Sequence, residues 1–240
     1  MTSDLSVRSG RKRAIGVLAA FAGMAVIFAT ADQTRADLIT LTFENDSGSP
    51  NSLPTPEAGG DPIPNGYGGL NWGATETSGF HYINGSTVSS PNGYINGRAS
   101  GTIVAFNKIA TVASVSGSIF DFNSAYFTGA WRNDLQITIA GTNGGNPVYS
   151  ETITVDATGP TLFNFTKFVG IDSLSFESFG GTNAGLASDG EHFVMDNFTY
   201  TTPSAVPEPS SMILLGTGLA SLMGYGGWRR KRGGTDSVAA

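Results

Sequence analysis

Hydrophobic and polar residues alternate with a period of two over much of the chain between residues 38 and 200. The alternation is clearest in LITLTF (residues 38–43) and LQITI (residues 135–139). A period of two predicts strands with one buried face. Similar runs predict about eleven strands in all, the others at residues 69–73, 80–83, 103–106, 113–122, 124–130, 148–155, 161–165, 171–176 and 192–200.

Turn residues separate these runs. Asn-Gly pairs at residues 84–85, 92–93, 96–97 and 143–144 predict tight hairpins, because such turns need positive φ angles. Residues 45–65 contain five prolines and predict a long surface loop.

The charged fraction is only 13%, with 33 glycines, which argues against a helical bundle. The prediction is an all-β fold, a single jelly-roll β-sandwich over residues 37–203.

The N-terminus has the three-part layout of a secretory signal peptide. Four basic residues (Arg8, Arg11, Lys12 and Arg13) precede an uncharged apolar run at residues 14–31, and small residues follow. Cleavage could follow Ala31 or Ala36, and we favour Ala36 because the first predicted strand begins just beyond it, which makes residues 1–36 the signal peptide. The alternative is an uncleaved anchor, since the run is longer than a usual signal core.

The C-terminus predicts a membrane span. Val206-Pro207-Glu208-Pro209 is followed by an uncharged stretch, residues 210–228, and then by Arg229, Arg230, Lys231 and Arg232. A helix over that stretch would be about 28 Å long, close to the ~30 Å hydrocarbon core of a bilayer. A basic cluster directly after an apolar span stays in the cytoplasm, so the preceding domain is predicted to be exported.

This combination resembles the PEP-CTERM protein-sorting tail of Gram-negative bacteria. The resemblance implies that exosortase, an integral-membrane protease, recognises Pro207, Glu208 and Pro209 within a sorting signal at residues 204–232. It also implies a cell-surface or matrix location associated with exopolysaccharide, biofilm or floc. The further tail at residues 233–240 departs from the family pattern, since such proteins tend to end soon after the basic cluster. A plain tail anchor with a chance Pro-Glu-Pro is the alternative.

Composition and charge exclude several classes of function. The chain has no cysteine, which removes disulfides, thiol enzymes and thiolate metal sites. From Asp37 to Pro209 there are 16 acidic and four basic residues, a formal charge of −12. Nucleic-acid binding needs clustered cations and is therefore excluded.

Aromatic side chains beside hydrogen-bonding groups are the candidates for sugar binding. The first choice is Trp131-Arg132-Asn133, predicted to stand at a turn between two strands. Core packing of the tryptophans is the competing interpretation. The second choices are Trp72, Tyr67, Tyr82 and His81.

The stretches at residues 65–72, 120–127 and 193–198 are similar to domains that precede PEP-CTERM tails. Those domains in turn look like galactose-binding-like or carbohydrate-binding-module jelly rolls. That resemblance implies a structural Ca²⁺ between the end of the first strand and the last strand. The matching ligands are Glu44 and Asp196, with Asn45 and Asp46 as further oxygen donors. Both acids could equally be exposed strand ends.

No catalytic motif is present, and only His81 and His192 could serve a serine triad. The sequence therefore predicts a non-enzymatic, exported protein, with exosortase as a partner and exopolysaccharide as the expected ligand. Two alternatives stay open: a purely structural surface protein without glycan affinity, and a carbohydrate-active hydrolase built on paired acids.

Overall fold

The computed structural model describes residues 36–46, 49, 51–203, 216–219 and 221–222. Apart from Ala36, the expected signal peptide lies outside the described residues. So do the possible cleavage site after Ala31, the Pro-Glu-Pro motif, the basic cluster, the final tail and most of the expected span. Residues 216–219 and 221–222 are helical. Within the described part of the chain, no helix is long and apolar enough to cross a membrane.

Strands are the main regular structure of the described domain. Its one α-helix is the single turn α1 (Gly93–Asn96), and short 3-10 turns lie at Tyr67–Gly69, Gly85–Thr87 and Lys108–Ala110. The strands are β1 (Leu38–Leu41), β2 (Asp61–Pro62), β3 (Phe80–Asn84), β4 (Ile103–Asn107), β5 (Ala113–Gly129), β6 (Arg132–Asn143), β7 (Asn146–Val155), β8 (Thr161–Asn164), β9 (Ile171–Asn183) and β10 (Phe193–Thr201).

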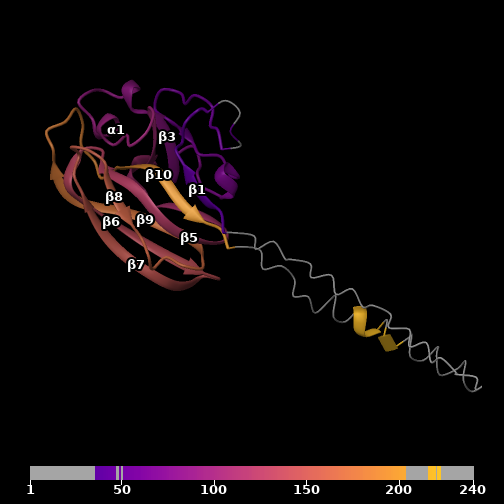
Figure 1. Cartoon of the computed structure of the whole chain (residues 1–240). Helices are drawn as coiled ribbons and strands as arrows, with labels where there is room; N and C mark the ends of the chain where they lie inside the picture. Colours follow the sequence, from indigo (N-terminus) through magenta and orange to yellow (C-terminus); the bar gives the residue numbers. More distant parts are fainter. Residues whose placement is uncertain (1–35, 47–48, 50, 204–215, 220, 223–240) are drawn as a thin grey trace, which may run out of the picture. The chain divides into compact units, whose positions relative to one another are not determined.

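These strands form two antiparallel sheets that share one strand (Figure 1). The first sheet runs β2-β3-β4-β10-β5, with β1 also beside β10 and β8 also beside β5. The second runs β5-β9-β6-β7. The β-sandwich expected from the sequence is confirmed.

Strand β5 connects the two sheets. Its first part pairs with β9, from Ala113 to Phe120, and its second part pairs with β10, from Asp121 to Gly129. A register shift lies between Ser116 and Phe120. Such an irregularity bends a strand without ending it, so the prediction of two separate strands, at residues 113–122 and 124–130, was wrong.

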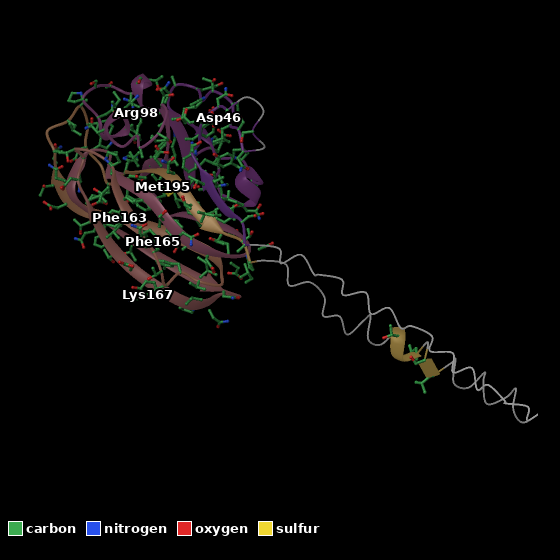
Figure 2. The ribbon with its side chains drawn as sticks, in the orientation of Figure 1. Asp46, Arg98, Phe163, Phe165, Lys167 and Met195 are labelled. Atoms are coloured by element: carbon green, nitrogen blue, oxygen red, sulfur yellow. The ribbon has the colours of Figure 1, made fainter. Side chains whose placement is uncertain are left out.

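The core between the sheets is built from aromatic rings. Trp72 is fully buried, and its ring meets those of Phe43, Phe80 and Phe198 edge-on at centroid distances of 5.7, 5.4 and 5.6 Å. Met195 on β10 is also fully buried (Figure 2). Phe80 and Met195 lie in runs of β3 and β10 where four consecutive residues are buried, so both faces of these strands are covered there.

Most Asn-Gly pairs do not make hairpins. Only the pair at residues 143–144 does, between β6 and β7. Asn84 and Asn92 instead cap helical turns, and their Oδ1 atoms accept hydrogen bonds from Ser86 N at 3.0 Å and Ile95 N at 2.8 Å. An asparagine can serve either purpose, and the local sequence does not distinguish them. The strand expected at residues 69–73 is likewise a turn with one isolated bridge, Asn71 to Ser116.

Candidate functional site

The two acids expected to bind Ca²⁺, Glu44 and Asp196, both hold the loop at residues 99–103. Glu44 Oε1 accepts hydrogen bonds from the backbone N–H groups of Thr102 and Ile103, each at 2.7 Å. Asp196 Oδ2 accepts from Ala99 N at 2.8 Å and Ser100 N at 2.9 Å. The two acids therefore bond the same loop.

Unusual backbone conformations accompany both carboxylates. Phe43, just before Glu44, has φ +63°, and Asn197, just after Asp196, has φ +50°. A bulky residue such as phenylalanine rarely adopts the left-handed region. The register of β10 against β5 also shifts after Asp196. The backbone is therefore irregular beside each of the two carboxylates that bond the loop at residues 99–103.

The contacts of these acids do not match a calcium site. Asp196 Oδ1 accepts from the Asn197 N–H at 2.7 Å, so both its oxygens face N–H donors rather than a cation. Asn45 bonds Thr55 Oγ1 at 3.1 Å instead of turning toward Glu44. Among the described residues, no three or more His, Asp or Glu side chains gather closely enough to hold a metal ion. Hard cations need several converging oxygens.

Burial changes the acidity of Asp196. The side chain is fully buried, and desolvation raises the pKa of its carboxyl from 3.8 to about 6. The three backbone N–H donors oppose this shift by stabilising the charged form, and the nearby charge of Glu44 adds to it. Desolvation has the larger effect.

Trp131, Arg132 and Asn133 do lie at the turn between β5 and β6, but their side chains are used inside the protein. Trp131 is 6% exposed and packs edge-on against Tyr94 at 5.6 Å between ring centroids. Arg132 bonds Asp189 Oδ1 at 2.7 Å, Glu191 Oε1 at 3.2 Å and a backbone carbonyl. Asn133 Oδ1 accepts from Ala157 N at 3.0 Å. The trio leaves neither a ring face nor a free donor fork for a ligand.

The second-choice aromatic residues are also interior. Trp72, Tyr82 and His81 are each no more than 2% exposed. Trp72 Nε1 donates to Tyr67 O at 3.0 Å, and Tyr67 Oη accepts from Phe43 N at 2.9 Å. Sugar stacking needs an accessible ring face. The aromatic platform expected from the sequence is therefore not at the surface of the described domain.

The two histidines lack the partners that a catalytic triad requires. His81 Nε2 lies 2.7 Å from Thr75 O, and the Nδ1 atoms of both His81 and His192 are buried without a hydrogen-bond partner among the described residues. A triad histidine is oriented by a carboxylate on one ring nitrogen. Burial, with a smaller effect of Lys108, also lowers the pKa of His192.

A polar surface groove is the feature that the sequence analysis missed. It runs beside the turn at residues 68–71 and crosses the first part of β5 onto β9. Two adjoining hollows of about 350 and 440 Å³ share Gly69 and Ser118. We define the serine groove by Gly69, Asn71, Ser116, Ser118, Asp172 and Ser173. These residues come from three separate stretches, so only the fold brings them together.

Comparison with known proteins identifies the C-terminal segment. Residues 205–231 match the family described as the PEP-CTERM protein-sorting motif. The chain carries a PEP-CTERM sorting motif. The matched residues include the Pro-Glu-Pro motif and all but the last residue of the basic cluster.

The PEP-CTERM chain also has structural neighbours. A DUF4465 family protein from Bacteroides caccae is 14% identical, with a TM-score of 0.45 over 68% of this chain and 98% of that one. One from Bacteroides ovatus is 9% identical, with a TM-score of 0.44 over 70% and 100%. TmCBM61, solved with β-1,4-galactotriose, is 10% identical, with a TM-score of 0.28 over 57% and 93%. No curated protein matches the chain.

Proposed function

We propose that this protein is sorted by exosortase to the cell surface or extracellular matrix of a Gram-negative bacterium, where it binds exopolysaccharide without catalysing a reaction. The PEP-CTERM motif at residues 205–231 carries the sorting half of the proposal. The domain architecture supports it: Leu38 pairs with Thr201, so both ends of the sandwich lie side by side (Figure 1). A domain whose two ends are adjacent can be attached to a membrane or matrix through its C-terminal tail alone.

The non-enzymatic part of the proposal rests on the burial and the hydrogen bonds of two acids, Asp196 and Glu44. A carboxyl with a raised pKa beside a second carboxylate is the usual arrangement of a glycosidase, and Asp196 with Glu44 has that electrostatic pattern. However, Asp196 is fully buried and its oxygens face backbone N–H groups. A substrate has no route to that carboxyl in this arrangement, which supports binding rather than hydrolysis.

Sorting is tested by comparing the protein in cells with and without exosortase. The change is the triple substitution Pro207→Ala, Glu208→Ala, Pro209→Ala, and Thr158→Ala in an exposed loop of the sandwich is the control. We expect mass spectrometry to find a surface form without Arg229 to Arg232 for the wild type and the control. The triple variant, and the wild type in cells without exosortase, should keep the full precursor. A surface form that retains the basic cluster would refute processing.

Glycan binding is tested with the full-length protein in mild detergent and the host's own exopolysaccharide. We expect saturable binding and no release of sugar. Sugar release that is lost on substituting paired acids would favour the hydrolase. Absence of binding together with concentration-dependent assembly would favour a purely structural surface protein.

A further inference from the structure

The serine groove is built from side chains that share one face of the sheet. Asn71 pairs with Ser116, Ser116 pairs with Ser173, and Ser173 pairs with Thr142 on β6. Residues directly opposite one another on paired strands project to the same face. These pairings therefore produce a row of short polar side chains that runs across the strands.

The polar groups of this row have no partners within the protein. The side chains of Asn71, Ser116, Ser118 and Ser173 make no hydrogen bond to any other described residue. Asp172 Oδ2 accepts from Gly144 N at 2.7 Å, and its Oδ1 has no hydrogen-bond partner among the described residues. By contrast, the amide of Asn107, in the interior, bonds Thr111, Ser178 and Phe193. Ser116 and Ser173 are partly buried and Asn71 and Ser118 are exposed, so all four side chains are accessible to a ligand.

The floor of the groove is apolar and its walls are low. Leu70, Phe120 and Tyr200 are buried where they line the first hollow, and the Tyr200 hydroxyl is tied to the Gly68 carbonyl. A Cβ on Gly117 would lie 2.9 Å from Leu70 Cδ2, so only glycine keeps that position open. At Gly69 a Cβ would meet only Tyr200 Oη, at 3.9 Å, so the groove is open there.

This chemistry selects the class of ligand. Hydroxyl and amide groups both donate and accept, which suits a polyol. No Lys, Arg or His lines the two hollows within the described domain, and Asp172 adds a negative charge. The domain as a whole is acidic, with 16 acidic residues against four basic ones from Asp37 to Pro209. Anionic ligands are therefore repelled.

We propose that the serine groove binds an uncharged saccharide segment, with Asn71, Ser116, Ser118 and Ser173 bonding its hydroxyls and Asp172 excluding acidic sugars. The inference rests on the proposed function, because it gives the exopolysaccharide a site. The volumes of the two hollows fall within the range of small-molecule sites. The site is distinct from the aromatic turn at Trp131.

The test uses the full-length protein and two probes, the neutral and the uronic-acid fractions of the host exopolysaccharide. The double variant Asn71→Ala, Ser173→Ala removes two polar groups, and Ser116→Leu fills the groove. The matched control is Thr158→Ala, Thr161→Ala, which removes two exposed hydroxyls elsewhere. Since none of these side chains has a partner, we expect thermal midpoints within about 2 °C of the wild type.

We expect the neutral fraction to bind, the double alanine variant to bind roughly tenfold to thirtyfold more weakly, and the control to match the wild type. Ser116→Leu should abolish binding. If the wild type binds but the groove variants bind equally well, the groove is refuted and the proposed function stands. If the wild type binds neither fraction, both fail together. Tighter binding of the uronic-acid fraction would overturn the preference for an uncharged ligand.

Discussion

Glu44, just after the first strand, and Asp196, in the last strand, each hold two N–H groups of one loop, residues 99–103. The two carboxylates are close enough for the charge of Glu44 to raise the pKa of Asp196. Two charges of the same sign are thus kept together at the interface between the outer strand β1 and the central strand β10. The backbone dipoles of the loop compensate that repulsion only in part, which makes the region sensitive to pH.

The stability of the domain should depend on the protonation of Asp196. The folded pKa, about 6, lies above the ordinary value of 3.8, so the folded state binds the proton more tightly than the unfolded state. The contribution of Asp196 is therefore fully present below about pH 3.8 and is lost as the pH rises through about 6. The loss is on the order of 3 kcal/mol.

Urea unfolding of the wild type and of Asp196→Asn between pH 4 and 8 isolates this effect. The stability difference between them should change between about pH 4 and 6 and level off above about pH 6. Glu44→Gln, which removes the neighbouring charge, should move the point of levelling-off to lower pH. A difference that stays constant with pH would show that the carboxyl titrates normally.

Chelation should leave the domain unchanged. The oxygens of Asp196 and Oε1 of Glu44 accept backbone N–H groups, and these donors would have to leave before a cation could enter. We expect the thermal midpoint measured by circular dichroism to be the same with 1 mM Ca²⁺ and with excess EDTA, within about 1 °C. Apo and Ca²⁺-soaked samples of Glu44→Gln serve as controls. A clear fall with EDTA, absent in that variant, would restore the calcium site that the sequence predicted.

Removing the central tryptophan should cost more than removing any surface aromatic residue. Trp72 is fully buried among four aromatic rings and donates a hydrogen bond from Nε1 to Tyr67 O. Trp72→Ala should lower the free energy of unfolding by about 3–5 kcal/mol, measured by urea denaturation. Phe179→Ala is the control, because Phe179 is 40% exposed, and it should cost less than about 1 kcal/mol. Equal losses would mean that Trp72 is not the centre of the core.

The sequence was sufficient for most strands but not for the sites. Strands such as β6 could be predicted because alternation is local: every second residue, as at Leu135, Ile137 and Ile139, is buried. Whether a tryptophan packs inward or faces a ligand depends on distant residues, and Trp131 is covered by Tyr94. The serine groove joins residues 71, 116 and 172, whose proximity follows from strand pairing. Alternating serines at residues 114, 116 and 118 were a visible signal, but serine also occurs in ordinary exposed strands.

Arg132 is predicted to hold the loop before β10 rather than to bind sugar. Its guanidinium bonds Asp189 twice, at 2.7 and 3.3 Å, and also bonds Glu191 and Gly180 O. In Arg132→Ala, we expect faster hydrogen–deuterium exchange and easier proteolysis over residues 184–191, because two acids there lose their common partner. Arg132→Lys keeps the charge but lacks the planar fork, and should be intermediate. High salt should loosen the same loop in the wild type.

The same variant separates the two candidate sugar sites. If the ligand occupies the serine groove, Arg132→Ala should bind the neutral exopolysaccharide as tightly as the wild type, even though its loop is looser. If affinity falls with Arg132→Ala but not with Asn71→Ala, Ser173→Ala, the ligand lies at the turn that the sequence alone predicted. Because Arg132 already bonds two carboxylates and a carbonyl, a sugar at that turn would have to displace contacts that the protein makes with itself, whereas the groove offers hydroxyls that have none.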